Sequence, residues 1–513
     1  MSHHRNFFEY LFEFSKTMDK KAIIEGNQTF SYDYLYNNVK NLALYIKHNF
    51  DTNQKYFLLC SDNSNFFIVC YFAIIAAGRI VIPLHPQTST ETINFICSNL
   101  NIETVFVQKR YINKFVNFKS INKFIVNEHP SNEYANLHIE LYNKSFNFTD
   151  ENELLTDELS SVAVLIFTSG STGTPKGVML SQKNLLANTE SIISYLNLNN
   201  SDIMMEVLPY SYCYGASWLH TMTRVGGTNV INNKFMLINR VLQEINSNYC
   251  TGFGGVPSHF QMLLRNSKIK EMTFPSLRFV AQAGGKLANV FIEELIQALP
   301  STKIYIMYGQ TEATARLSYL PPELLKIKLG SIGKGIPGVT LDVLNKKGQP
   351  VKKGEVGTIV ASGDNVMVGY WNDPEETSKT IINGKLWTGD LATVDEDGFI
   401  YVVDREKHFI KSGGHRISPK EIEDHIAKLT YVIECAVIGV FDDMLGEAPK
   451  AYVVIKNYKK ESEDEYKQEI QTHCRKELAS FKVPKYIEFI KALPKNTSNK
   501  VLVNELKKLN QYP

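Results

Sequence analysis

The chain has 513 residues, of which 44% are hydrophobic, so it can bury a large core and we expect at least two domains. Its 55 basic and 53 acidic residues nearly cancel, which excludes an overall attraction to nucleic acid or to an anionic membrane surface. The seven cysteines are scattered without a CxxC pair, a pattern typical of reduced thiols in a cytoplasmic protein.

The N-terminal part of the sequence predicts neither a secretory signal nor membrane insertion. The aromatic stretch over 7–14 is interrupted by Glu9 and Glu13, unlike the apolar core of a signal peptide. The strongest apolar run, 67–77, is shorter than the roughly 20 residues that a membrane span needs. We expect a buried helix there, followed by a strand over 80–83.

A loop of small residues with one lysine, 168–177, follows an apolar, β-branched run over 161–167. The run predicts a buried strand, and an extended pattern resumes at Val178, so the loop joins two strands. Such a loop cannot use a helix dipole, and its backbone amides must bind an anion themselves. The composition favours a binding site for nucleotide phosphates over a solvated turn. Glycines that can take positive φ, short hydroxyl donors and one amine form this predicted site: Thr168, Ser169, Gly170, Ser171, Thr172, Gly173, Thr174 and Lys176.

A Walker-type phosphate loop is the alternative for this segment. That motif needs Gly where Pro175 stands and Ser or Thr where Gly177 stands, and a helix should follow it directly. The segment departs from the motif on all three points.

Through the first 400 residues, apolar strands alternate with helical patterns, which is typical of layered α/β sheets. Ser181 is placed to cap a helix, and further strands are expected over 278–281 and 303–307. Ligands gather at strand ends in such sheets. Small residues that follow these two strands are therefore candidate ligand contacts: Gly284, Gly285 and Gly309.

The last third of the chain changes character twice. Short alternating strands with glycine turns over 339–368 predict a small β-rich subdomain. Beyond residue 407, the pattern predicts a compact α+β unit of about a hundred residues. Its expected order is helix, strand, strand and helix, over 419–428, 432–440, 448–455 and 461–478.

Five further segments stand in order after the phosphate loop, and together they resemble one superfamily. They are YGQTE over 308–312, WTGD over 387–390, DREK over 404–407, KSGGHRISP over 411–419 and PKNTSNK over 494–500. With them, the chain resembles the adenylate-forming enzymes, which comprise acyl-CoA synthetases, peptide-synthetase adenylation domains and beetle luciferases. It is most similar in type to AMP-forming acyl-CoA synthetases, and the resemblance covers nearly the whole chain.

The resemblance implies a domain plan and an activity. An ATP- and acyl-binding domain of layered α/β sheets with a β-rich subdomain would cover 1–404, a hinge 405–407, and a small mobile α+β lid 408–513. The implied activity is an ATP-dependent, AMP-forming acid–thiol ligase that adenylates a carboxylic acid, releases pyrophosphate and transfers the acyl group to CoA. Two alternatives stay open: loading of the phosphopantetheine of a separate carrier protein, and nucleotide binding without catalysis. The expected cofactors are ATP, Mg²⁺ and CoA or carrier-protein phosphopantetheine.

Several motif residues have side chains suited to ATP. Tyr308 offers a ring face to adenine, and Thr311 offers a hydroxyl to a phosphate. Asp390 can accept both hydroxyls of a ribose, and Arg405 can donate to the ribose or to a phosphate. Carboxylate oxygens suit Mg²⁺, which Glu312 would bind. The expected metal ligands are Thr168 and Glu312.

Lys500 is the residue that we expect to carry adenylation. The resemblance implies that it reaches from the small domain to the acyl carboxylate and the α-phosphate, where its ammonium stabilises developing charge. Relatives usually have Gly before this lysine, whereas this chain has Asn499, a residue that tolerates left-handed conformations. The expected catalytic set is Lys500, Thr311, Glu312 and Tyr212.

The second half-reaction needs a different arrangement of the same chain. The resemblance implies that the small domain rotates about Lys407 and brings Lys411, Gly413 and Gly414 toward the adenylate. The two glycines would let a pantetheine thiol pass close to the backbone. An ordinary hairpin turn is the alternative for this Gly-Gly pair.

The acyl pocket is expected on segments that match the pocket of relatives. Amino-acid-activating relatives place an aspartate where this chain has Cys213, and no carboxylate lies over 210–223. A substrate ammonium would stay unpaired there, so a neutral acyl chain fits better. Tyr212 stands where many acyl-CoA synthetases have a histidine or aromatic gate, although a core tyrosine is equally compatible. The expected acyl contacts are Tyr212, Cys213, Trp218, Phe253, Val256, Ala283 and Gly284.

Overall fold

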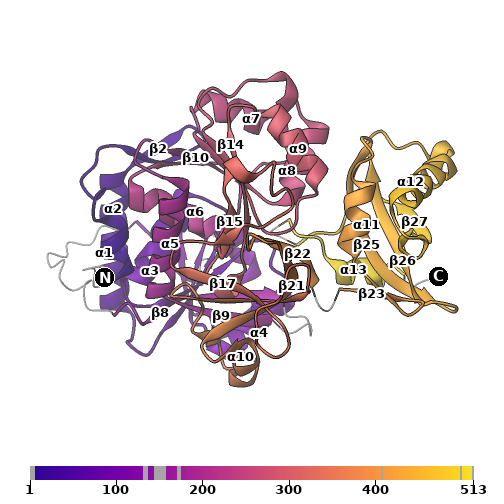
Figure 1. The fold of residues 1–513 in the computed structure, drawn as a ribbon. Helices are drawn as coiled ribbons and strands as arrows, with labels where there is room; N and C mark the ends of the chain where they lie inside the picture. Colours follow the sequence, from indigo (N-terminus) through magenta and orange to yellow (C-terminus); the bar gives the residue numbers. More distant parts are fainter. Residues whose placement is uncertain are drawn as a thin grey trace.

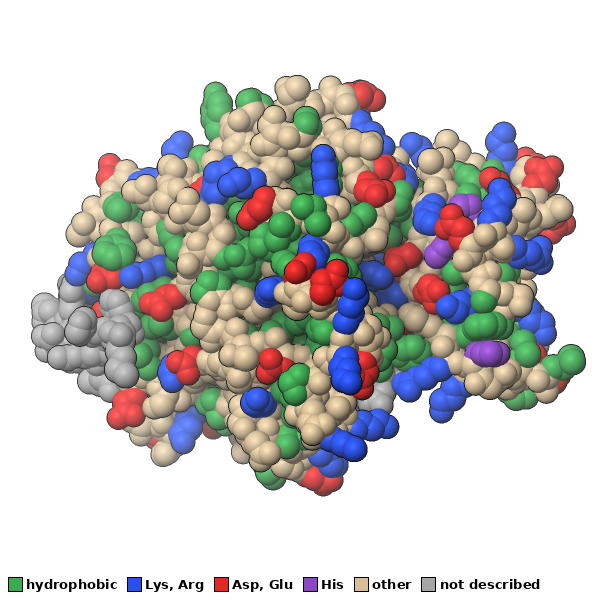
Figure 2. Space-filling view, in the orientation of Figure 1, with side chains coloured by type: hydrophobic (Ala, Val, Ile, Leu, Met, Phe, Trp, Pro, Cys, Tyr) green, Lys and Arg blue, Asp and Glu red, His purple; other side chains and the backbone are tan. Residues whose placement is uncertain are grey.

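The computed structural model describes residues 6–130, 134, 137–143, 158–169, 175–405, 408–496 and 499–510, with the side chain of Ser169 left out. A large lobe contains three sheets, and a small C-terminal lobe stands beside it (Figure 1). On the face seen in Figure 2, acidic and basic side chains are interspersed over both lobes, as the near-zero net charge implies. Within the described residues, the helices fall short of the length and hydrophobicity that crossing a bilayer demands.

The first large sheet has eight strands in the order β19-β9-β8-β4-β3-β5-β6-β7, and its central pairs are parallel. The strands β8 and β9 pair antiparallel, so the predicted phosphate loop does join strand to strand. The strands are β3 (Tyr56–Cys60), β4 (Ile80–Leu84), β5 (Thr104–Val107), β6 (Lys123–Val126), β7 (His138–Leu141), β8 (Val162–Ser169), β9 (Pro175–Ser181) and β19 (Gly369–Tyr370).

The second large sheet has nine strands in the order β16-β15-β14-β13-β12-β10-β11-β1-β2. The run from β14 to β1 is parallel, which places the ends of β13 and β14 at one edge of the sheet. The strands are β1 (Lys21–Glu25), β2 (Gln28–Ser31), β10 (Ile203–Glu206), β11 (Thr228–Ile231), β12 (Gly252–Gly255), β13 (Phe279–Gln282), β14 (Lys303–Tyr308), β15 (Ser318–Leu320) and β16 (Lys334–Gly335).

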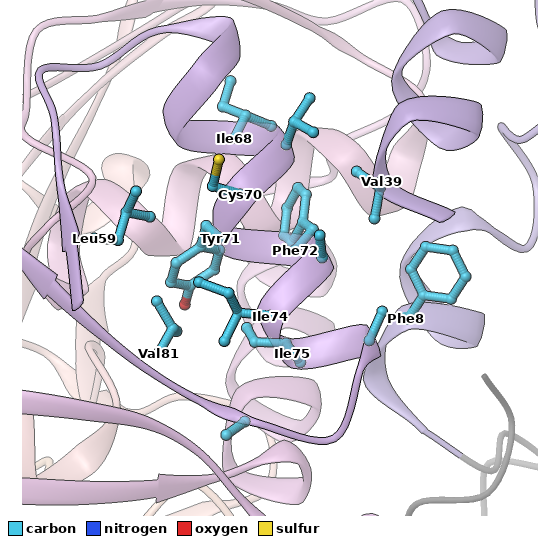
Figure 3. Close-up of a cluster of buried hydrophobic side chains, with 14 of the residues drawn as sticks. Phe8, Val39, Leu59, Ile68, Cys70, Tyr71, Phe72, Ile74, Ile75 and Val81 are labelled. Carbon is cyan, nitrogen blue, oxygen red and sulfur yellow. The ribbon is translucent and has the colours of Figure 1, made fainter. Parts of the chain in front are cut away.

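Helix α3 forms the centre of the core of the large lobe. All 12 of its residues are buried, which confirms the helix expected from the apolar run. Figure 3 shows Tyr71 and Phe72 of this helix among side chains of α1, α2 and two strands, including Phe8, Val39 and Val81. The helices are α1 (Phe7–Phe12), α2 (Tyr32–Asn49), α3 (Asn65–Ala76), α4 (Thr90–Leu100), α5 (Gln182–Leu196), α6 (Cys213–Val225), α7 (Ile238–Ser247), α8 (Pro257–Asn266), α9 (Asn289–Ala298), α10 (Pro374–Thr380), α11 (Pro419–Ile426), α12 (Glu463–Glu477) and α13 (Val503–Lys508).

The third sheet is the β-rich part that the sequence predicts. Its antiparallel strands β21 and β22 set Asp390 directly opposite Arg405. The strands are β17 (Val339–Leu344), β18 (Gly357–Gly363), β20 (Ile381–Ile382), β21 (Lys385–Val394) and β22 (Ile400–Arg405).

The C-terminal lobe has its own sheet and its own core. Ile422 of α11 and Ile470 of α12 pack with Val453 of the sheet, so the expected α+β unit is confirmed. The layered α/β architecture of the large lobe is confirmed as well. The C-terminal strands are β23 (Ile410–Ser412), β24 (His415–Ile417), β25 (Val432–Asp442), β26 (Gly446–Ile455) and β27 (Tyr486–Phe489).

Candidate functional site

A cavity of about 410 Å³ lies between the two lobes. It is bounded by the ends of β13 and β14, by the β21–β22 pair and by the C-terminal segment around residue 500. Six of the expected nucleotide contacts and Lys500 therefore meet at one place, although they are far apart in the sequence. The expected residues that line it are Gly284, Gly285, Tyr308, Gly309, Asp390, Arg405 and Lys500.

Asp390 is the centre of a compact polar cluster in this cavity. Its Oδ2 accepts from the Tyr308 hydroxyl at 2.6 Å, and its Oδ1 accepts from Arg405 Nε at 2.9 Å. Gly389 precedes it with a φ of 74°, the tight turn that lets Asp390 enter the cavity. The carboxylate raises the pKa of Arg405 further, and burial raises the pKa of Tyr308 well above its ordinary value. The three side chains thus present charged and polar edges that can receive a ribose.

Lys500 enters the cavity from the C-terminal lobe. A Cβ on Gly284, which has a φ of 86°, would lie 3.5 Å from Lys500 Cε and 2.9 Å from Val256 Cγ1. Burial lowers the pKa of Lys500, the positive charge of Arg405 lowers it as well, and Cys213 and Glu312 oppose the shift. The Lys500 amine therefore interacts electrostatically with both Cys213 and Glu312.

Asn499 adopts the left-handed conformation that its residue type allows, with a φ of 59°. Its carbonyl accepts from Ser258 Oγ at 3.2 Å, and its side-chain nitrogen lies 3.0 Å from His259 Nε2. The turn that relatives build with glycine is thus formed here with asparagine and attached to α8 of the large lobe.

Glu312 lies in the short 3-10 helix Thr311–Ala313, and its Oε1 accepts from the Tyr370 hydroxyl at 2.8 Å. The ring of Tyr370 also lies 5.4 Å from Lys176 Nζ, and that amine forms an ion pair with Glu376. Tyr370 and Glu376 are site residues that the sequence did not indicate. No local spacing connects Glu376 to a lysine 200 positions earlier in the chain.

The donor set around Glu312 fits Mg²⁺, which prefers one or two carboxylates together with substrate phosphates. Glu312 supplies a carboxylate near the positive charges of Lys500 and Arg405, where a nucleotide triphosphate would also be attracted. The Thr168 hydroxyl has only a long contact, 3.5 Å, to the carbonyl of Lys176. Both expected metal ligands therefore have oxygen atoms suited to the ion.

Other expected residues lie elsewhere or outside the described residues. The loop residues Gly170, Ser171, Thr172, Gly173 and Thr174, and the hinge residue Lys407, are outside the described part of the chain. Lys411, Gly413 and Gly414 form the β23–β24 turn, and they are not among the described residues that line the cavity. In this arrangement the structure brings Lys500 to the nucleotide cavity and leaves that turn apart from it.

The expected acyl contacts divide into two groups. Cys213 begins α6 with its Sγ 3.6 Å from Thr311 Oγ1, and Val256 and Ala283 are buried next to Gly284. Trp218 and Phe253 are instead packed in the core of the second large sheet, and neither lines a cavity described here. Tyr212 precedes α6 and stacks on the ring of His85 at a centroid distance of 6.3 Å.

Two family models match the chain, the AMP-binding enzyme over residues 13–371 and the AMP-binding enzyme C-terminal domain over residues 421–500. A long-chain-fatty-acid–CoA ligase of Bacillus subtilis (strain 168) is 28% identical over 470 residues, which are 86% of this chain and 82% of that protein. A feruloyl-CoA synthase of Amycolatopsis sp is 35% identical over 367 residues, 70% of this chain and 72% of that protein.

Solved structures share the whole fold. An anthranilate CoA ligase in complex with anthranoyl-AMP has a TM-score of 0.88 at 22% identity, covering 99% of this chain and 98% of that chain. An o-succinylbenzoate CoA synthetase from Bacillus subtilis, in complex with its acyl-adenylate intermediate, has a TM-score of 0.80 at 25% identity, covering 99% of both chains. Because the family model matches well over half of its residues, the chain belongs to the AMP-binding enzymes and is an AMP-forming acid–thiol ligase of the acyl-CoA synthetase type.

Proposed function

We propose that the cavity between the lobes adenylates a small carboxylic acid with ATP and that the acyl group then passes to the thiol of CoA. The observation that carries the proposal is the position of Lys500 beside Gly284, in one cavity with Asp390 and Arg405. An amine in a cavity with groups suited to ribose and phosphate can stabilise an anionic transition state.

In the first half-reaction, an oxygen of the acid attacks the α-phosphorus of ATP and pyrophosphate leaves. Lys500 would contact the attacking carboxylate and the α-phosphate, while Asp390 would accept the ribose hydroxyls. Thr311 would donate to a phosphate oxygen, and Lys176 would bind the outer phosphates together with the loop over 168–174. Tyr308 and Gly309, at the end of β14, would contact the adenine.

Mg²⁺, when bound by Glu312 and Thr168, would neutralise phosphate charge. The ion would arrive with ATP, and the Tyr370 hydroxyl keeps the Glu312 carboxylate oriented for it.

In the second half-reaction, the CoA thiol attacks the acyl carbonyl and AMP leaves. We propose that residues 408–513 rotate about 405–407 against the domain over 1–404, and that Lys411, Gly413 and Gly414 then approach the adenylate. Gly413 and Gly414 both have positive φ in the described turn, 54° and 82°, so this backbone can come close to a ligand without a side chain. Transfer to a carrier-protein phosphopantetheine is the competing acceptor, which uses the same thiol chemistry.

A cytoplasmic location is part of the proposal. All seven cysteines of the chain are free thiols, as a reducing compartment allows. Fractionation of cells that produce the protein would test this.

The decisive experiment is acid-dependent exchange of labelled pyrophosphate into ATP with Mg²⁺, over a broad panel of carboxylic acids. We expect exchange with at least one acid, and we expect Lys500→Ala to lower its rate by about 10² or more, because a pre-placed cation is lost. Lys508→Ala is the control, since this lysine pairs with Glu505 within the C-terminal lobe and is not among the described residues that line the cavity. Absence of exchange with every acid would contradict the proposal, and full exchange in Lys500→Ala would contradict the role of that residue.

A further inference from the structure

A second, smaller cavity lies behind Cys213, among α3, α5 and α6. Its free volume is about 10 Å³, which is room for one water-sized group. Cys213 connects it to the adenylation site, because its thiol lines this cavity and contacts Thr311 Oγ1. A short acid with its carboxyl group at Lys500 would therefore extend past Cys213 toward this cavity.

Asn188 of α5 lines the small cavity and has an acceptor atom without a donor. The residue is 1% exposed, and its Nδ2 donates to the carbonyl of Arg316 at 3.1 Å. Because that carbonyl can only accept, the orientation of the amide is defined, and Oδ1 is the atom left over. Asn188 Oδ1 is buried with no hydrogen-bond partner among the described residues. A buried acceptor in this condition is costly unless a ligand supplies a donor.

The other polar groups of the cavity wall are already used. His220 Nε2 lies 3.1 Å from the Tyr71 hydroxyl, the Ser217 hydroxyl donates to the carbonyl of Tyr214 at 2.7 Å, and the Thr189 hydroxyl donates to Leu185 O at 2.7 Å. Among the described polar groups of this wall, Asn188 Oδ1 is thus the acceptor that lacks a hydrogen-bond donor.

One charged group contacts the cavity wall, because the buried Arg316 guanidinium donates through Nη2 to Ser217 Oγ at 3.1 Å. The described residues that line it include no Asp, Glu, Lys or Arg. Burial lowers the pKa of His220 to about 3 and raises the pKa of the Cys213 thiol, so both are neutral near pH 7. An ammonium group would be buried here beside that guanidinium and without a counter-ion, which is costly.

We propose that this cavity receives the far end of the acid, and that Asn188 Oδ1 accepts a hydrogen bond from a neutral hydroxyl or amino group there. The substrate class is then a short carboxylic acid with an uncharged hydrogen-bond donor remote from its carboxyl group. This inference rests on the proposed adenylation, and it assigns Asn188 as a specificity-determining residue.

The test compares pairs of acids of equal shape in the pyrophosphate exchange assay. One pair is p-hydroxybenzoate and p-methylbenzoate, and another is a short ω-hydroxy acid and the plain alkyl acid of the same length. We expect kcat/KM to favour the hydroxyl member by roughly tenfold or more, since a site built around a polar atom rejects the analogue that leaves it unpaired. We expect Asn188→Leu to abolish or invert this preference.

Asn365 provides a matched control within the same fold. It is buried, its Nδ2 donates to the same Arg316 carbonyl at 2.9 Å, and its Oδ1 is also unpartnered, but it does not line the cavity. Asn365→Leu therefore removes the same backbone contact, and we expect it to leave the ratio between the paired acids unchanged.

The outcomes separate the two proposals. Exchange with methyl and hydroxyl members at equal efficiency would overturn the inference while adenylation stands, and the cavity would then be the site of a structural water. Exchange with no acid at all would overturn the proposed function and the inference with it. The wild-type preference is measured without any variant, so poor folding of Asn188→Leu does not remove the test.

Discussion

Asp390 binds two partners at once, the Tyr308 hydroxyl and the Arg405 guanidinium. A ribose would replace or join the first of these, and a carboxylate that accepts two hydroxyls contributes about 1.5–3 kcal/mol per charged hydrogen bond. We expect Asp390→Ala to raise KM for ATP by roughly 10- to 100-fold in the exchange assay.

Tyr308→Phe is the matched control for this prediction. It removes the same hydroxyl contact to Asp390 but keeps the ring that would face adenine and the carboxylate that would face the ribose. We expect only a few-fold change in KM, because the carboxylate that would bind the ribose remains in place. Equal losses in the two variants would show that the Tyr308 contact, and not ribose binding, is what Asp390 provides.

The pH dependence of adenylation should report on Lys500. Its ammonium is the active form, and burial lowers its pKa below the value of about 10.4 for a free lysine. The rate should therefore be highest below the pKa in the folded protein and fall as pH rises through it, with a midpoint below that of a free lysine. A profile of log kcat/KM against pH measures this midpoint, because that ratio reports the ionisation of the free enzyme.

The Cys213 thiol is the other group near Lys500 that titrates on the alkaline side. Burial raises the pKa of this thiol and lowers the pKa of Lys500, so a variant is needed to tell the two groups apart. Cys213→Ala should keep the alkaline fall of the rate, although its size can change with the acid used. Loss of the alkaline fall in that variant would assign it to the thiol.

At the scale of elements, strand β9 and helix α10 are joined by the ion pair between Lys176 and Glu376. The side chains are 18% and 33% exposed, so the pair contributes about 1 kcal/mol at most. Glu376 competes with phosphate oxygens for the same amine. We expect Glu376→Gln to lower KM for ATP by roughly two- to fivefold, as measured by initial rates.

The neighbouring Glu375 offers a matched control for that prediction. Its carboxylate pairs with Lys379 on the exposed side of the same helix, so Glu375→Gln removes one negative charge without touching Lys176. We expect KM for ATP to stay unchanged in this variant. A higher KM in Glu376→Gln alone would mean that Glu376 orients Lys176 for phosphate instead of competing with it.

At the scale of the whole molecule, a few polar contacts hold the C-terminal lobe against the large lobe. Lys286 pairs with Asp424 at 2.7 Å, and Lys456 donates to the carbonyl of Arg265 at 2.8 Å. Polar contacts of this kind permit relative motion more readily than a large apolar interface does. They therefore suit a lobe that occupies two positions in one reaction cycle.

Fixing the hinge should separate the two half-reactions. Lys407→Pro restricts φ at the position about which we expect the lobe to rotate. We expect this variant to keep acid-dependent pyrophosphate exchange and to lose most of its acyl-CoA formation. Thioester formed from supplied acyl adenylate measures the second step alone.

Lys500→Ala is the opposite control for the hinge prediction. It should lose adenylation and still transfer an acyl group from supplied adenylate to CoA, because its amine is needed only in the first step. Unimpaired thioester formation by Lys407→Pro would rule out rotation about that residue.

Local patterns in the sequence were enough to predict most elements of the fold. Ser181 does cap α5, where its hydroxyl accepts from Asn184 N at 3.2 Å and its own N donates to Asn184 Oδ1 at 2.8 Å. Gly389, which lies within β21 directly before Asp390, has a positive φ of 74°. Caps, turns and apolar runs depend on neighbours within a few positions, so a single sequence shows them.

The sequence by itself determined the family, the layered α/β plan and the identity of Lys500, Glu312, Asp390 and Arg405 as candidates. Tertiary structure alone decided that Tyr370 contacts Glu312, that Trp218 is buried in the core, and that Asn188, whose Oδ1 has no donor among the described residues, lines the small cavity. The physical reason is that a motif records which groups are present, whereas side-chain contacts over long sequence separations arise only when whole sheets and lobes pack.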